Sequence, residues 1–183
     1  MNRTATLLAG CIVAAFIFAT GFAPQAPPAT VVFLVRHAEK AATPTADPPL
    51  TPDGEARARA LAAALRDADL QAILVTQYAR TQLTALPAAQ QAGVDLTVIA
   101  IQSSGMDGAA AVDANVRATT ERIRANPGKN ALVVGHSNTI PAIIRALGAP
   151  DPGSIGENDY DNFFVVTLRE GRTPTLVRAR YGR

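Results

Sequence analysis

The sequence has few of the residues that build disulfides, metal sites or aromatic stacking platforms. Its 183 residues include one cysteine, so no disulfide can form within the chain. Two histidines are too few for a histidine-rich metal site. Tryptophan is absent and aromatic residues make up 5%, which argues against a surface that stacks single-stranded nucleic acid. A net charge of +2, from 17 Lys and Arg against 15 Asp and Glu, is too weak a bias for a nucleic-acid partner.

The composition is typical of one globular domain. Hydrophobic residues make up 48% of the chain and charged residues 17%, which excludes disorder and collagen-like repeats. A chain of this length can bury about 70% of the surface that its unfolded form exposes. It therefore needs neither a disulfide nor a metal ion to fold.

The N-terminal segment differs from the rest of the chain. Residues 7–23 carry no charged side chain, as in a secretory signal peptide or a marginal membrane anchor. Leu8-Ala9-Gly10-Cys11 resembles a bacterial lipobox, but the apolar run continues beyond Cys11, which favours a cysteine inside the apolar run of a signal peptide. Three prolines follow at Pro24, Pro27 and Pro28. We expect residues 1–29 to be a signal peptide or N-terminal membrane anchor with a Pro-rich spacer, and residues 30–183 to form the functional domain.

Short apolar runs alternate with helical patterns in this domain. The runs at residues 31–35, 72–75 and 131–134 predict strands that are buried on both faces. Further strands are expected at residues 94–101, 163–169 and 175–181. Helices are expected at residues 52–66 (capped by Thr51), 80–92 and 109–125, and a fourth would be capped by Asn138 or Thr139 and end near Gly148.

Buried strands separated by helices predict an α/β fold. Parallel neighbours need crossover connections, and helical crossovers cover both faces of the sheet. The expected fold is a three-layer α/β/α sandwich with a mainly parallel central sheet.

Polar clusters follow three of the predicted strands. They are Arg36-His37-Ala38-Glu39, Thr76-Gln77-Tyr78-Ala79-Arg80 and Gly135-His136-Ser137-Asn138. The carboxyl ends of parallel strands meet at one edge of a sheet, so both histidines and two arginines should converge there. Guanidinium groups bind phosphate oxygens bidentately, and an imidazole can attack phosphorus. The pattern therefore predicts phosphoryl transfer through a phosphohistidine.

These clusters resemble the motifs of the histidine phosphatase superfamily, which has the phosphoglycerate mutase-like fold. Leu34-Val35-Arg36-His37-Ala38-Glu39 is similar to its Arg-His-Gly or Arg-His-Ala signature, and Leu50-Thr51-Pro52-Asp53-Gly54 to the start of its first helix. Tyr78 to Ala85 and Val134 to Asn138 are similar to its second and third motifs. His136 is followed by Ser137, not by the Asp of the acid phosphatase and phytase branch, so the chain resembles the phosphoglycerate mutase branch.

The resemblance implies roles for individual residues. His37 would be the nucleophile, and Arg36, Arg80 and His136 would form the rest of the phosphate pocket, with Asn138 shaping it. No metal and no cofactor is implied. The general acid is less defined: Asp107 is the only carboxylate between residues 99 and 112, where larger relatives carry a glutamate. Asp107 is equally suited to a turn before Gly108. The alternative acids are Glu39, and Glu157, Asp159 and Asp161.

We therefore expect an exported phosphomonoesterase that acts on a small-molecule or protein-bound phosphate ester, with no nucleic-acid partner and with possible anchoring to the membrane through the N-terminal segment. The expected location is periplasmic, secreted or on the outer face of the cytoplasmic membrane. Two alternatives are a phosphoglycerate mutase-type phosphotransferase and a phosphate-binding regulatory module without turnover.

Overall fold

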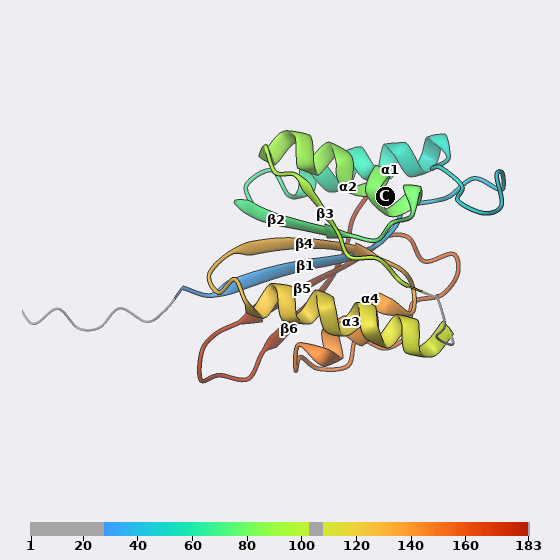
Figure 1. The fold of residues 1–183 in the computed structure, drawn as a ribbon. Coiled ribbons are helices and arrows are strands. Elements are labelled where there is room, and N and C mark those ends of the chain that lie inside the picture. The colour runs from blue at the N-terminus through green and yellow to red at the C-terminus, as the bar shows by residue number, and fades with distance from the viewer. Residues whose placement is uncertain (1–27, 103–107, 183) are drawn as a thin grey trace, which may run out of the picture.

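The structure is a computed structural model that describes residues 28–102 and 108–182. It contains one six-stranded sheet with two helices on each face (Figure 1). The strands are β1 (Thr30–Arg36), β2 (Leu70–Val75), β3 (Leu96–Val98), β4 (Asn130–Gly135), β5 (Asn162–Leu168) and β6 (Thr175–Arg180). The helices are α1 (Pro52–Ala64), α2 (Ala79–Ala92), α3 (Gly108–Arg124) and α4 (Thr139–Ala146). The α/β sandwich expected from the sequence is confirmed.

The sheet has the strand order β3-β2-β4-β1-β5-β6. Strands β1 to β4 pair in parallel, while β5 is antiparallel to β1, and β6 to β5. Because β1 and β4 are neighbours in parallel, their carboxyl ends lie side by side. Arg36 at the end of β1 pairs with Gly135 at the end of β4.

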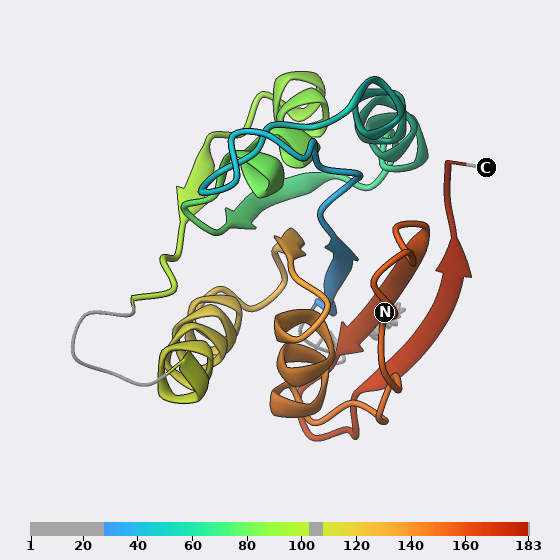
Figure 2. The ribbon, with the colours of Figure 1, turned by 90° about the vertical axis from the view of Figure 1, so that its right-hand side faces the viewer.

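Two apolar cores lie on opposite faces of the sheet. Residues of α1 and α2, such as Leu61 and Ala85, pack on one face, and residues of α3 and α4, such as Ile123 and Ile140, pack on the other. Figure 2 looks onto the edge where β1 and β4 end and shows both pairs of helices. The three layers leave this edge free for connecting loops.

Several predicted boundaries need correction. The strand expected at 94–101 is formed only by Leu96–Val98. Ile99 N still donates to Val75 O of β2 at 2.8 Å, and beyond it the backbone of Ile101 bonds with the Gln77 side chain. Helix α1 ends at Ala64, before Arg66. The Thr51 cap is confirmed, since its hydroxyl accepts a hydrogen bond from Gly54 N at 3.1 Å. Neither residue proposed to cap α4 does so with its side chain: Asn138 makes no capping bond, and Thr139 is the first helical residue.

Gly54 is required by close packing at the start of α1. A Cβ atom there would lie 2.3 Å from the backbone oxygen of Glu39. The same oxygen accepts a hydrogen bond from Thr51 N at 2.9 Å. The start of α1 is thus held against the segment that follows His37.

No helix within residues 28–102 and 108–182 has both the length and the apolar character needed to cross a membrane. The predicted signal peptide or anchor lies almost entirely outside these residues.

Candidate active site

The two histidines of the chain lie together at the carboxyl edge of the sheet. His37 follows β1 and His136 follows β4, and His37 N donates to Gly135 O at 2.9 Å. The centroids of the two imidazole rings are 5.4 Å apart, at an interplanar angle of 65°. Both side chains are buried. The convergence predicted for the two strand ends therefore occurs.

An open cavity of about 500 Å³ adjoins the two imidazoles. Its walls combine two cationic side chains, an aromatic ring, two aliphatic side chains and polar groups. The lining residues are His37, Lys40, Tyr78, Arg80, Ile101, Val112, His136, Ser137 and Asn138. Among the described residues, this lining includes two cations and no carboxylate. The cavity is therefore suited to an anionic ligand with an apolar portion.

Arg80 enters the cavity from the first turn of α2. Its guanidinium lies over the Tyr78 ring, 4.2 Å from the centroid, and Nη1 is 3.8 Å from Asp47 Oδ1. Its Nε is buried without a hydrogen-bond partner in the part of the chain that the structure describes. Thr84 on the next turn donates to Arg80 O and accepts from Ala38 N, so α2 is tied to the segment after His37. A buried donor without an acceptor is what a bound phosphate oxygen would satisfy.

Arg36 differs from the expectation, because it is not among the residues that line the cavity. Its Nη1 donates to the backbone oxygens of Gly156 and Glu157, both at 2.6 Å, and its guanidinium lies 4.3 Å from the Tyr160 ring centroid. The loop before β5 therefore holds the outer part of this side chain. Its Nε is buried and, within the described residues, has no hydrogen-bond partner. Arg36 thus contributes positive charge beside both histidines, and its Nε is able to donate to an anion.

Each histidine has a lowered pKa. Burial, followed by the positive charges of Arg36, Arg80 and Lys40, lowers the pKa of His37 to about 4. Burial and the neighbouring His37, Arg80 and Arg36 lower the pKa of His136 to about 3. Both imidazoles are therefore neutral at pH 7.

The orientation of His37 identifies its reactive nitrogen. Nδ1 lies 2.8 Å from Ala38 O, and a carbonyl oxygen only accepts, so Nδ1 carries the proton. The neutral ring then has its lone pair on Nε2. Nε2 is the atom able to form a bond to phosphorus.

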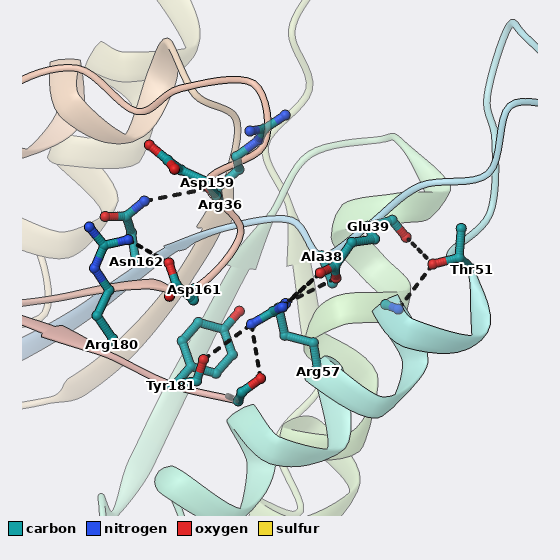
Figure 3. A network of polar contacts seen from close by, with 12 residues as sticks. Arg36, Ala38, Glu39, Thr51, Arg57, Asp159, Asp161, Asn162, Arg180 and Tyr181 are labelled. Carbon is teal, nitrogen blue, oxygen red and sulfur yellow. Dashed lines mark hydrogen bonds and ion pairs between the residues drawn. The ribbon is translucent and has the colours of Figure 1, made fainter.

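Among the described residues, none of the carboxylates considered as general acids lines the cavity. Asp107 lies outside the described residues. Glu39 forms an ion pair with Arg57, with Oε1 2.7 Å from Nη2 (Figure 3). Burial opposes ionisation of Glu39, but the hydrogen bonds from Arg57 outweigh it and lower its pKa. Glu39 is therefore a poor proton donor at neutral pH, and it supports the segment after His37.

The other candidate acids, in the loop before β5, are engaged or exposed. Asp161 pairs with Arg180, Asp159 accepts from Gly156 N at 3.0 Å, and Glu157 is exposed to solvent. None of them is among the residues that line the cavity. This loop instead supplies the carbonyl groups that hold Arg36.

Several residues at the site were not singled out from the sequence. Thr76 and Tyr78 belong to the second polar cluster, and their position after β2 was a usable signal. Tyr160 and Asp47 lie in irregular loops and reach the site only through the tertiary fold. No local sequence pattern marks such residues.

The described residues contain no group of three or more His, Cys, Asp or Glu side chains able to hold a metal ion. The ligand groups present at the cavity are imidazoles, cations and hydroxyls. These groups fit an anion.

Comparisons with known proteins agree with this geometry. Residues 32–101 match the family model described as Histidine phosphatase superfamily (branch 1). The matched range contains Arg36, His37 and Arg80, whereas His136 lies beyond it. No curated protein matches the sequence.

Solved structures with the same fold include three bacterial proteins. One is assigned as the phosphohistidine phosphatase SixA from Nakamurella multipartitia, with 23% identity, coverage of 86% of this chain and 99% of that chain, and a TM-score of 0.58. The mycobacterial glucosyl-3-phosphoglycerate phosphatase has 15% identity, coverage of 84% and 99%, and a TM-score of 0.60. Phosphoglycerate mutase from Bacillus anthracis has 15% identity, coverage of 85% and 94%, and a TM-score of 0.60. At these identities the likeness concerns the fold.

Proposed function

We infer from the match over residues 32–101 that the chain belongs to the histidine phosphatase superfamily, and we propose that it is a phosphomonoesterase that forms a phosphohistidine on His37. One observation carries the proposal. The unprotonated Nε2 of His37 belongs to a ring 5.4 Å from that of His136, and both residues line one cavity with Arg80. The nucleophile and a cation able to bind phosphate thus line the same cavity.

The chemistry follows from these groups. His37 Nε2 attacks phosphorus, the bond to the ester oxygen breaks, and the alcohol leaves with a proton. Water then attacks the phosphohistidine, which releases inorganic phosphate and restores the imidazole. Arg80, Arg36 and His136 stabilise the charge that spreads over the phosphoryl oxygens in both steps.

Hydrolysis is a better assignment than phosphoryl transfer between two substrates. A mutase must retain its phosphorylated intermediate and exclude water, whereas the described residues form an open cavity. The apolar residues Ile101 and Val112 in its wall favour an ester with an organic group, either free or attached to a protein. Among relatives, one is named as a phosphohistidine phosphatase and one as a phosphatase of a sugar-linked phosphoglycerate.

Two parts of the proposal concern residues outside the described ranges. Asp107 would donate the proton to the leaving oxygen, because in the sequence it falls between Ile101 and Val112, which both line the cavity. Residues 1–29 would direct export, and cell fractionation tests this. Full-length protein recovered from the cytoplasm with an intact N-terminus would contradict export.

The function is tested by hydrolysis of p-nitrophenyl phosphate with purified wild-type protein and His37→Ala. We expect steady release of inorganic phosphate by the wild type and a loss of roughly 10³-fold or more in the variant, because the attacking nitrogen is gone. Phosphate binding without turnover would favour the regulatory module. Turnover of His37→Ala within tenfold of the wild type would contradict the mechanism.

A further inference from the structure

A buried chain of hydroxyl groups lies behind His136. Thr76, directly after β2, places its Oγ1 3.1 Å from His136 Nε2 and 3.0 Å from Thr81 Oγ1 in the first turn of α2. The exposed fractions are 4% for Thr76, 0% for Thr81 and 9% for His136. Water does not compete for these hydrogen bonds, so the direction of each one is set by the protein.

The direction of the hydrogen bonds among Thr81, Thr76 and His136 follows from where each side-chain proton lies. Thr81 Oγ1 lies 2.8 Å from Tyr78 O and 3.1 Å from Thr76 O, and a carbonyl only accepts, so we assign the Thr81 proton to its shortest contact, Tyr78 O. The contact between the two hydroxyls allows either of them as donor, and with this assignment Thr76 donates to Thr81 Oγ1. The Thr76 oxygen is left as an acceptor, so the proton of neutral His136 lies on Nε2 and its lone pair on Nδ1.

The two imidazoles are therefore held in opposite tautomers. His37 carries its proton on Nδ1, where it donates to Ala38 O, and has its lone pair on Nε2. His136 has its lone pair on Nδ1. Backbone contacts also fix His136, because its N donates to Thr139 Oγ1 at 2.8 Å and its O accepts from Ile140 N at 3.0 Å.

We propose that Thr81 and Thr76 act as positioning residues that hold His136 in the Nε2-protonated tautomer, so that Nδ1 takes a proton from a phosphate monoanion as it binds. The assigned tautomer of His136 does not depend on the proposed phosphatase function, whereas the proton uptake rests on it.

The proton transfer is balanced within the bound complex. A phosphate monoanion and a neutral imidazole become a phosphate dianion and an imidazolium, and no other group changes its proton count. The imidazolium can then donate from Nδ1 to a phosphoryl oxygen while Nε2 still donates to Thr76. The proton leaves with the released phosphate.

The surroundings of His136 explain why uptake depends on the ligand. The charged or titratable groups that face it are His37, Tyr78, Arg80 and Arg36. Before an anion binds, burial and the nearby cations disfavour a further positive charge on His136. A bound dianion reverses this balance because it places two negative charges beside the ring.

Nitrogen-15 NMR tests the proposal directly, because the chain has two histidines. The full chain is labelled at the imidazole nitrogens, prepared without a polyhistidine tag and measured at pH 7. His37→Asn identifies the signals of His136. We expect His136 to show a protonated Nε2 and an unprotonated Nδ1, and His37 the reverse. Saturating inorganic phosphate should then protonate both nitrogens of His136.

Variants of Thr76 test whether its hydroxyl sets the tautomer of His136 or only contributes to packing. Thr76→Val should give His136 a mixture of tautomers, and Thr76→Ser should restore the wild-type pattern because it keeps the hydroxyl. Thr120→Val is the matched control, since Thr120 is also a buried threonine whose hydroxyl bonds a backbone carbonyl, but in α3.

Each contrary result removes a defined part of the proposal. A protonated Nδ1 in the unliganded wild type, or an unchanged spectrum in Thr76→Val, would show that Thr81 and Thr76 do not set the tautomer of His136. The expected tautomer without further protonation in saturating phosphate would overturn the proton uptake. If phosphate does not bind at all, the proposed function fails, while the tautomer is still read from the free protein.

Discussion

At the scale of single residues, the site is ordered before any ligand binds. His37 Nδ1 and His136 Nε2 are each committed to a partner within the fold, at 2.8 and 3.1 Å. The guanidinium of Arg80 is stacked on Tyr78 while its Nε has no partner among the described residues. Groups fixed in advance need little reorganisation when charge develops on a transferring phosphoryl group.

Arg80→Lys should reduce phosphatase activity strongly. Lysine keeps the positive charge but loses the planar fork that binds two oxygens and stacks on Tyr78. We expect kcat/KM to fall by about 10²-fold, or about 2.7 kcal/mol of transition-state stabilisation. Steady-state kinetics with Arg59→Lys, at an exposed position of α1, provide the control. Equal kinetics for Arg80→Lys and wild type would exclude Arg80 from the phosphate pocket.

Asp107→Asn tests whether this residue donates the proton to the leaving group. The variant should slow hydrolysis of an alkyl phosphate much more than that of p-nitrophenyl phosphate, whose leaving group departs as a stable anion. Asp113→Asn, at an exposed position of α3, should affect neither substrate. If both substrates slow equally in Asp107→Asn, the carboxyl has another role.

The sequence was sufficient to predict the residues whose place depends on local structure. His37, His136 and Arg80 each follow a buried strand, directly or at the next helix start, and this alone brings them to one edge. Arg36 was expected in the same pocket, and its charge does lie near both histidines, but its Nη1 is bound by the carbonyls of Gly156 and Glu157. That contact joins segments about 120 residues apart in the chain, and no local pattern encodes it.

At the scale of elements, the junctions between strands and helices position the site. Thr84 of α2 accepts from Ala38 N, and the start of α1 packs on Glu39. Arg57 of α1 connects Glu39 to the backbone oxygens of Tyr181 and Gly182 after β6 (Figure 3). The segment after His37 is thus held by α1, α2 and the C-terminal strand.

Each helix and strand predicted from the sequence occurs in the structure, and the errors concern their ends. Strand β3 is shorter than predicted, and at its carboxyl end the backbone of Ile101 bonds with the side chain of Gln77 and not with a neighbouring strand. Asn138 occupies the N-cap position of α4, as one of the two alternatives expected, but its side chain makes no capping bond, and Thr139 Oγ1 instead accepts from His136 N.

Gly54→Ala should weaken the junction between α1 and the segment after β1. The added Cβ would lie 2.3 Å from Glu39 O, so the backbone must shift. We expect the free energy of unfolding to fall by roughly 1–3 kcal/mol, as in other overpacked sites. Urea denaturation measures it. Gly108→Ala is the control because nothing lies within 4 Å of its Cβ, and equal stability of the two variants would contradict the packing argument.

At the scale of the whole molecule, two buried neutral histidines make stability depend on pH. Their pKa values in the folded protein, about 4 and about 3, lie below the ordinary value of 6.5. Below pH 6.5 the unfolded chain binds protons that the folded chain does not. The free energy of unfolding is therefore unaffected by protonation of the two histidines above pH 6.5. It falls as the pH drops from 6.5 toward the folded pKa values of about 4 and about 3.

Urea denaturation at pH 7 and pH 5 tests this linkage. Each histidine should cost roughly 2 kcal/mol of stability at pH 5 relative to pH 7. A variant with both His37→Asn and His136→Asn should lose correspondingly less over the same interval. The same loss in the variant and the wild type would show that other groups cause the pH dependence.

The central claim is that His37 carries the phosphoryl group during turnover. Its most direct test is rapid quenching in alkali of wild-type protein that is hydrolysing p-nitrophenyl phosphate, followed by mass spectrometry of its peptides. We predict an acid-labile, alkali-stable phosphate on the peptide that contains His37, formed and lost at rates that support turnover and absent from His37→Ala. Turnover that proceeds with no phosphate on His37 at any quench time would contradict the account.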